Sequence, residues 1–557
     1  MKKRTNLTLL FCLLFFNNSF AQVDGENNNF VLKSTSFGFD DFWKSGGGGI
    51  RGLVAGTDID KDGLYEIITT DYDDGGKVHI FEITGDNQLQ WIWSSPGFDS
   101  TAVTTCRFVG VSDLDGNGKQ EILLSISEST NNPSTAAGIY VYEWTGQNNG
   151  FNSEPNAITR AKVAVSQFKC DSFFAKDIDN DGKEELVLAI NGDGDQDYFV
   201  VLSVNGNFAL NNVIWIKEAE YRKNVHFQGD AVNVLSSDLD GDGHWEILGQ
   251  SAHNMMILPI EARLPDQYSV GTSFVMNESF NDVNLINGVA IDIDGDGRDE
   301  VFYNGWKTGN LYLLSTDGDA LSLDETDVTV LSQGGGGAPF ASFGMAFGDQ
   351  DHGFGTDGKD LYIGAGGNTS DLFNLEYIGG DVKNPNSYQW HINYYDPTDG
   401  NAIVTRVLAP SVDLDKDGNK ELVLGYQSIP DNIDGQPVDK HWLRILEYDF
   451  PTSVNNNAWN VEVPAELFLV ENYPNPFTEH TIFSATLRID GYLQGSIFNV
   501  LGQRVATIVQ GNWRQKGTYE WRWDGTNDSG NILSKGIYYA SFNLNGYKTL
   551  KRITLLR

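Results

Sequence analysis

Acidic residues recur at alternate positions in six short segments of the chain. The clearest segment carries Asp292, Asp294 and Asp296, followed by Gly297, and has Glu300 at its ninth position. In a tight turn, alternate side chains point their oxygens at one centre, where bare carboxylates would repel one another unless a cation were bound. Ca²⁺ suits such a turn because it takes about six to eight oxygen ligands in flexible geometry. The segment therefore predicts a calcium loop, in which Gly297 permits a sharp turn with positive φ.

The other segments repeat the pattern, and in each one the backbone carbonyl of position seven can add a ligand to the side chains of positions one, three, five and nine. Between the fifth and the last regular copy lies a degenerate one, in which an insertion separates the first two aspartates from the third. The residues predict about seven Ca²⁺ sites, and the departure of the sixth copy leaves its occupancy in question. The expected ligand residues are Asp58, Asp60, Asp62, Leu64, Glu66; Asp113, Asp115, Asn117, Lys119, Glu121; Asp177, Asp179, Asp181, Lys183, Glu185; Asp238, Asp240, Asp242, His244, Glu246; Asp292, Asp294, Asp296, Arg298, Glu300; the degenerate Asp349, Asp351, Asp357; and Asp413, Asp415, Asp417, Asn419, Glu421.

An EF-hand is the first alternative for such loops, and the flanking sequence argues against it. An EF-hand needs two helices and a glutamate at position twelve, whereas position twelve is Thr69 in the first copy and Leu124 in the second. The residues after each position-nine glutamate are apolar or β-branched, as in Glu121-Ile-Leu-Leu-Ser125. Such runs favour a β-strand after the loop.

The strands that position the loops repeat with the same spacing. Successive copies begin 54 to 64 residues apart, and each unit contains four short strand-like runs. Such a period is typical of propeller blades. We therefore expect an all-β chain with a seven-bladed β-propeller over residues 46–463. Two segments could close the ring: Ala458–Val463, which resembles the fourth strands of the other units and is slightly favoured, or Phe30–Ser36.

The units resemble the FG-GAP (VCBS-type) repeats of integrin α-chain propellers and of many bacterial secreted proteins. The resemblance covers about residues 45–455 and rests on the acidic loop, the apolar strand after it and the Gly-rich segments before it. It implies Ca²⁺ bound between the first and second strands of each blade. It also implies that ligands are received on the opposite face of the ring, where we place the longer loops 126–138 and 427–440.

Residues 464–557 read as a separate module, a small Ig-like β-sandwich. This module closely resembles the C-terminal type A sorting domain of the type IX secretion system of Bacteroidetes. The matching residues are Asn472–Phe477, Asn499–Gln503, Trp523–Gly525, Lys535–Tyr539 and Lys551–Arg557. The resemblance implies that the type IX secretion machinery is a partner, with export across the outer membrane and either release or surface attachment. An ordinary Ig-like domain is the alternative.

The N-terminus indicates export as well. Met1-Lys-Lys-Arg4, a short apolar run from Leu9 to Phe16 and Ser19-Phe20-Ala21 have the order of a secretory signal peptide over residues 1–21. Residues 22–45 form a polar lead-in. The apolar run is too short to span a bilayer stably, and no later segment is a transmembrane candidate. We therefore expect a secreted or outer-surface protein.

Composition limits the partners. The formal net charge is −38, which seven Ca²⁺ would move to −24, and no basic stripe is present, so nucleic acid is not an expected partner. Of three cysteines, Cys12 lies in the leader. Cys106 and Cys170 each precede a loop by seven residues. An oxidising compartment would permit a disulfide between them, although equivalent strands of neighbouring blades are usually too far apart.

The sequence contains no His-Glu-x-x-His, Gly-x-Ser-x-Gly, Walker or Cys-x-x-Cys motif. No catalytic residue or organic cofactor is predicted, and a binding role is favoured over an enzymatic one. We expect a calcium-binding adhesion or recognition module with an unknown glycan or protein ligand. The alternative is a secreted carbohydrate-active enzyme, a polysaccharide lyase or hydrolase, built on the same propeller.

Overall fold

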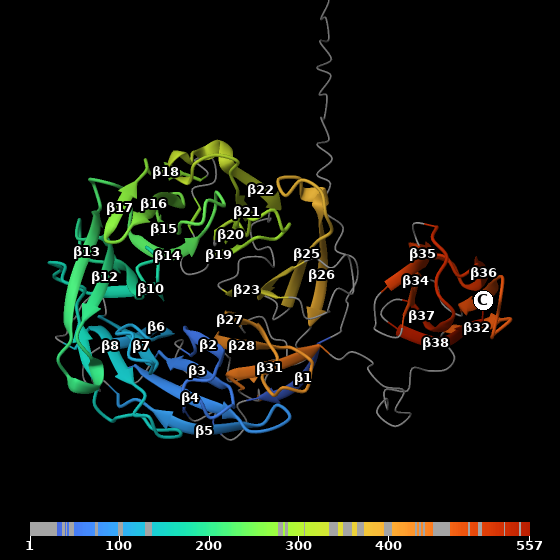
Figure 1. Ribbon diagram of the computed structural model, residues 1–557, viewed down its shortest axis with the longest axis horizontal. Helices are drawn as coiled ribbons and strands as arrows, with labels where there is room; N and C mark the ends of the chain where they lie inside the picture. The colour runs from blue at the N-terminus through green and yellow to red at the C-terminus, as the bar shows by residue number, and fades with distance from the viewer. Residues whose placement is uncertain are drawn as a thin grey trace, which may run out of the picture.

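The chain folds into a ring of antiparallel sheets and a separate C-terminal sandwich (Figure 1). No α-helix occurs in the described part of the chain, which confirms the all-β expectation. The computed structural model describes residues 30–35, 39, 42–43, 49–72, 76–97, 104–128, 136–276, 282–283, 288–305, 307–332, 344–348, 359–364, 372–394, 404–428, 432–433, 436–437, 441–448, 468–487, 491–499, 504–527, 530–544 and 547–556.

Seven sheets form the ring, as predicted, and in the first six the strands pair in chain order. The blades are, in order, β2 Leu53–Thr57, β3 Glu66–Asp71, β4 Lys77–Ile83, β5 Leu89–Ser94; β6 Thr104–Ser112, β7 Glu121–Glu128, β8 Gly138–Glu143, β9 Ala157–Thr159; β10 Lys169–Lys176, β11 Glu185–Asn191, β12 Tyr198–Asn205, β13 Ile214–Arg222; β14 Ala231–Ser237, β15 Glu246–Ser251, β16 Met256–Leu264, β17 Gln267–Val270, with β18 Phe274–Val275; β19 Gly288–Ile291, β20 Glu300–Asn304, β21 Leu311–Leu314, β22 Val328–Ser332; and β23 Gly344–Gly348, β24 Asp360–Gly364, β25 Leu372–Tyr377, β26 Tyr388–Tyr394.

The seventh blade closes the ring with a strand from the other end of the propeller. It consists of β27 Val404–Val412, β28 Glu421–Ser428, β31 Leu443–Tyr448 and β1 Phe30–Thr35, in the order β1-β31-β28-β27. Figure 1 shows β1, in blue, beside the orange β31. The slight preference for Ala458–Val463 as the closing strand was therefore wrong, because β1 occupies the edge of β31; residues 458–463 lie outside the described residues. The propeller includes β1 from the expected lead-in.

The second strand of each blade explains why the sequence folds this way. β3, β7 and β15 are buried at every position, since neighbouring blades cover both of their faces. A strand buried on both faces favours apolar residues at consecutive positions, and such residues follow the opening glutamate, as Ile67 and Ile68 do in β3 and Ile247 and Leu248 do in β15. Neighbouring blades pack through these side chains, for example Leu123 of blade two and Leu188 of blade three, which share one apolar cluster.

Short elements complete the propeller: the 3₁₀ turns η2 Phe208–Leu210, η3 Ala320–Ser322, η4 Glu325–Asp327 and η5 Pro385–Ser387, and the hairpin β29 Asn432–Ile433 with β30 Gln436–Pro437. The C-terminal module is a two-sheet sandwich, as predicted, with Phe483, Trp523 and Phe542 in its core. Its strands are β32 Phe468–Tyr473, β33 Thr481–Leu487 and β36 Gly517–Trp523 in one sheet, and β34 Gly491–Phe498, β35 Arg504–Arg514, β37 Gly536–Leu544 and β38 Tyr547–Leu555 in the other.

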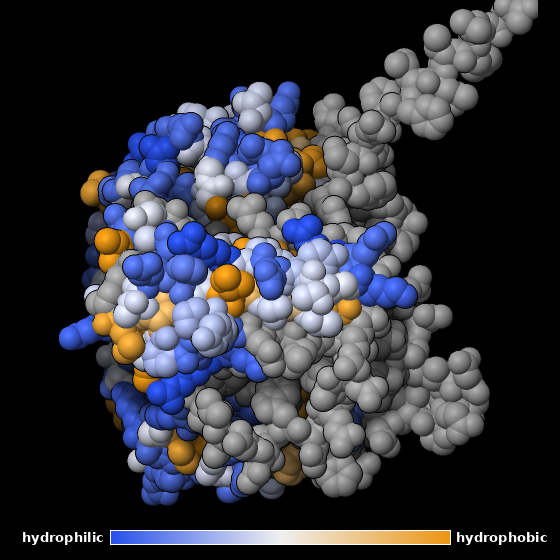
Figure 2. Space-filling model, turned by 90° about the vertical axis from the view of Figure 1, so that its right-hand side faces the viewer, coloured by the Kyte–Doolittle hydropathy of each residue, from blue (hydrophilic) through white to orange (hydrophobic). Residues whose placement is uncertain are grey.

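The described surface is mainly hydrophilic on the face shown in Figure 2, where hydrophobic side chains are scattered among polar ones. Among the described residues, no helix is long and apolar enough to cross a bilayer.

Candidate calcium centres

The six regular acidic segments occupy one place in the fold: each connects the first strand of a blade to the second. The first runs from the end of β2 to the start of β3, and Glu66 is the first residue of β3. The other five glutamates likewise open β7, β11, β15, β20 and β28. All six loops therefore lie at the same ends of their blades and on one face of the ring, as the sequence predicted.

The same internal hydrogen bonds hold all six loops. The carboxylate of position one accepts the N–H of position six at 2.9–3.4 Å. The carboxylate of position three accepts the N–H of position five at 3.0–3.3 Å. The side chain of position five accepts the N–H of position seven at 2.8–2.9 Å. Each loop is thus folded around its own acidic side chains.

Position six is glycine in every loop because the turn requires positive φ. Gly63 has φ 95° and Gly418 has φ 100°, while a Cβ at either position would meet no heavy atom within 4 Å. The requirement is therefore conformational and not one of space.

The position-nine glutamates are buried, and in four of them one carboxylate oxygen has no hydrogen-bond partner. All six are at most 2% exposed. In each, Oε2 accepts the N–H of position two at 2.5–3.0 Å. Oε1 has no hydrogen-bond partner in Glu66, Glu121, Glu246 and Glu421. An unpaired buried carboxylate oxygen is strongly unfavourable, so these atoms indicate a missing positive partner.

The position-one aspartates also have buried carboxylate oxygens without partners. The Oδ1 atoms of Asp58, Asp113, Asp177 and Asp413 are also buried and have no hydrogen-bond partner. In the first loop, ligand atoms of Asp58, Asp60, Asp62 and Glu66 lie within 4.8 Å of one another. The corresponding sets Asp113, Asp115, Glu121 and Asp177, Asp179, Glu185 do the same.

The ionisation of the glutamates reflects this crowding. Burial, followed by the neighbouring aspartates, raises the pKa of Glu66, Glu185, Glu300 and Glu421 to about 8. The same causes raise the pKa of Glu121 and Glu246 to about 9. Without a cation these groups would therefore hold protons near neutral pH, and a bound cation would displace those protons.

A second ring of glutamates was missed by the sequence reasoning. On the third strand of four blades, a glutamate lies directly opposite the position-nine glutamate, in the pairs Glu66–Glu82, Glu121–Glu143, Glu246–Glu261 and Glu421–Glu447. All four third-strand glutamates are at most 3% exposed. Like charges directly opposite on neighbouring strands are destabilising, so these pairs add to the demand for positive charge.

Basic side chains form ion pairs with three of the third-strand glutamates. Lys119 lies 3.4 Å from Glu143, Lys33 lies 2.9 Å from Glu447, and Arg263 bonds Glu261. These bases contact the third-strand glutamates, whereas the unpaired oxygens of position nine stay without a partner. The basic residues therefore do not replace a cation inside the loops.

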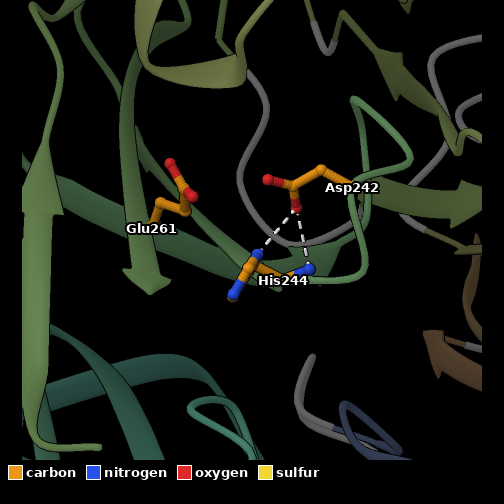
Figure 3. Close-up of side chains that lie close together, drawn as sticks. All are labelled: Asp242, His244 and Glu261. Carbon is orange, nitrogen blue, oxygen red and sulfur yellow. Dashed lines mark hydrogen bonds and ion pairs between the residues drawn. The ribbon is translucent and has the colours of Figure 1, made fainter. Parts of the chain in front are cut away.

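The side chain of His244, whose backbone carbonyl is the predicted ligand, bends back toward its own loop. Its Nδ1 lies 3.1 Å from the Oδ1 of Asp242 (Figure 3). Ligand atoms of Asp242, His244 and Glu261 lie within 4.8 Å of one another. Arg263 already neutralises Glu261, so this group does not resemble the interior of the loops.

The degenerate loop cannot be placed in the same way. Asp349, Asp351 and Asp357 lie outside the described residues. Asp360, which the sequence reasoning did not select, opens β24 where the other blades have their glutamate, and it faces Glu376 on β25.

The donor set fits a hard cation of the calcium class. It consists of carboxylates at fixed spacing in a loop with positive-φ turns, and its unpaired oxygens are buried at equivalent positions. Hard divalent cations prefer such oxygen ligands. Neither thiol is part of this set: Cys106 and Cys170 are both buried and are not disulfide-bonded.

Residues 493–546 match the model of the FlgD Ig-like domain, in keeping with the C-terminal sandwich. Among solved structures, the chain is similar to PorZ, described as an essential bacterial surface component of the type-IX secretion system of Porphyromonas gingivalis. That match has 13% identity and a TM-score of 0.26, and it covers 91% of this chain and 81% of PorZ.

A second solved structure is the periplasmic gluconolactonase PpgL of Pseudomonas aeruginosa. It is 12% identical with a TM-score of 0.38, and the match covers 62% of this chain and 84% of PpgL. No curated protein matches the chain.

Proposed function

We propose that the chain is an exported calcium-binding propeller that presents a rigid face for adhesion or recognition. One observation carries the calcium assignment: buried carboxylate oxygens without partners recur at the same two positions of several blades. Ca²⁺ would be held by the side chains of positions one, three, five and nine and by the carbonyl of position seven. Its role would be structural, since it would neutralise each acidic cluster and fix the turn between two strands.

The recognition role is proposed from the position of the acidic loops on the ring. The loops occupy one face of the ring, and we assign ligand binding to the opposite face, where β29 and β30 lie between β28 and β31. Most of the longer connections on that face, including residues 129–135 and 438–440, lie outside the described residues. The proposed ligand is a glycan or a surface protein.

A glycan array and a surface pull-down, each with and without Ca²⁺, test this role with the full chain and with a chain that ends at residue 463. Retention of a defined glycan or partner by both forms would support the role. Turnover of a polysaccharide would contradict it in favour of the lyase or hydrolase alternative.

We also propose that residues 464–557 direct export through the type IX secretion system. The support is the resemblance of the tail motifs together with the observed sandwich. Fusion of this module, behind a signal peptide, to a periplasmic reporter tests the assignment in a bacterium that has the system. The reporter should reach the medium or the cell surface, and its retention in the periplasm would contradict the assignment.

A further inference from the structure

The position-three aspartates make a contact that the calcium assignment does not require. One oxygen, Oδ1, stays inside the loop, where it accepts the N–H of position five. In five of the six loops, the other oxygen, Oδ2, accepts a backbone N–H from the connection between the third and fourth strands of the next blade. The bonds, at 2.5–2.9 Å, are Asn149 to Asp60, Phe208 to Asp115, Asp266 to Asp179, Ala320 to Asp240 and Asn87 to Asp415.

Asparagine makes this contact twice, with the same backbone geometry. Asn87 and Asn149 have φ 50° and 55°, in the left-handed region. Besides its backbone bond, each donates its side-chain amide to the third-strand glutamate of the preceding blade: Asn87 to Glu447 at 2.8 Å and Asn149 to Glu82 at 3.4 Å. One residue of the following blade thus holds two acidic groups of the preceding blade.

The loops also contact one another directly. The Nζ of Lys61 in loop one donates to the carbonyl of Gly118 in loop two at 2.6 Å, and Lys416 in loop seven donates to the carbonyl of Gly63 in loop one. Both lysines occupy position four, where no ligand is predicted. These contacts join consecutive loops around the ring, including the junction between blade seven and blade one.

We propose that each calcium loop is one half of a latch between neighbouring blades, so that cation binding and closure of the blade junction stabilise each other. The position-three carboxylate links the two events: a cation would fix its orientation, and that orientation presents Oδ2 to the next blade. Without a cation, repulsion within the cluster favours rotation of the carboxylate and loss of the bond. By linkage, opening of the junction must then weaken cation binding. This inference rests on the proposed calcium binding.

Hydrogen exchange of the full chain, measured by mass spectrometry with Ca²⁺ and after its removal, separates the two claims. The latch predicts that connections with no ligand, around Asn87, Asn149, Asp266 and Ala320, lose protection together with the loops when Ca²⁺ is removed. The turn at residues 192–197, at the opposite ends of β11 and β12, should not change. Loss of protection in the loops alone would overturn the latch and leave the calcium assignment standing. No change in the loops would overturn both.

A pair of glycine variants tests the contact of Asn87 at the junction between blade seven and blade one. Asn87→Gly keeps the left-handed backbone and its N–H but removes the amide that reaches Glu447. Asn224→Gly is the matched control, because Asn224 is also left-handed, with φ 61°, and is exposed between β13 and β14, outside the connections that contact the loops. We expect Asn87→Gly to raise the free Ca²⁺ needed for half-maximal protection of loop seven by roughly two- to tenfold, the worth of one buried hydrogen bond. An unchanged requirement, equal to that of Asn224→Gly, would overturn the role of the Asn87 side chain in the latch.

Discussion

Removal of Ca²⁺ should lower the stability of the propeller by an amount that can be worked out from the number of loops. A ligand that binds only the folded state stabilises it by RT ln(1 + [L]/Kd). Calcium modules of extracellular proteins bind with Kd of about 0.1–1 mM. At about 10 mM free Ca²⁺, each site then contributes roughly 1.4–2.7 kcal/mol. The six regular loops together would contribute roughly 8–16 kcal/mol if their contributions add.

This free energy converts into a large shift in melting temperature. Unfolding entropies of about 2.1 cal/mol/K per residue give a propeller of this size about 1 °C per kcal/mol, so the expected shift is roughly 8–16 °C. Differential scanning fluorimetry of Ca²⁺-free protein, titrated with CaCl₂, measures it, and MgCl₂ at equal ionic strength controls for charge screening. A shift no larger with Ca²⁺ than with Mg²⁺ would refute the reasoning.

Three further predictions follow from the buried carboxylates and the closing strand. In Ca²⁺-free protein, the melting temperature should fall as the pH rises from about 5 to 9. Burial raises the pKa of Glu66 from 4.5 to about 8 and that of Glu121 from 4.5 to about 9, so the folded state holds protons that the unfolded chain has released. A melting temperature that stays constant or rises with pH would contradict this sign. Glu121→Gln should stabilise the Ca²⁺-free protein but reduce the stabilisation by Ca²⁺ by the contribution of one site, roughly 1.4–2.7 kcal/mol. Calorimetric unfolding measures both effects, and the exposed control Glu154→Gln should show neither. Equal behaviour of the two variants would rule out Glu121 as a ligand. Deletion of residues 22–35 should expose the edge of β31 and promote aggregation, measured by light scattering; a monomeric chain of unchanged stability would argue against closure by β1.

The loops and their strands could be predicted because their signals are local. Alternate carboxylates, a glycine and an apolar run specify the turn and the buried strand within about a dozen residues, as at Asp58–Asp71. The blade count followed from the repetition of this unit. Local signals of this kind are the most reliable part of a sequence.

Ring closure and the second ring of glutamates had no local signal. β1 pairs with β31 across more than 400 residues of chain, and the two candidate strands differ little in composition. The third-strand glutamates lie 15 to 26 residues after their partners, as in Glu246–Glu261 and Glu421–Glu447. Only the strand register places each pair face to face. The same holds for Asn87, whose partner Asp415 is 328 residues away.

The account depends on the acidic turns binding calcium, and a direct count of bound ions tests it. The full chain is dialysed to equilibrium in excess NaCl against about 10 mM free Ca²⁺, well above the Kd of about 0.1–1 mM used above. The excess of Ca²⁺ on the protein side is then measured by inductively coupled plasma mass spectrometry against the protein concentration. We predict about six Ca²⁺ per chain, or seven if the degenerate loop also binds, and about one fewer for Glu121→Gln. A stoichiometry near zero, or one that Glu121→Gln leaves unchanged, would contradict the account.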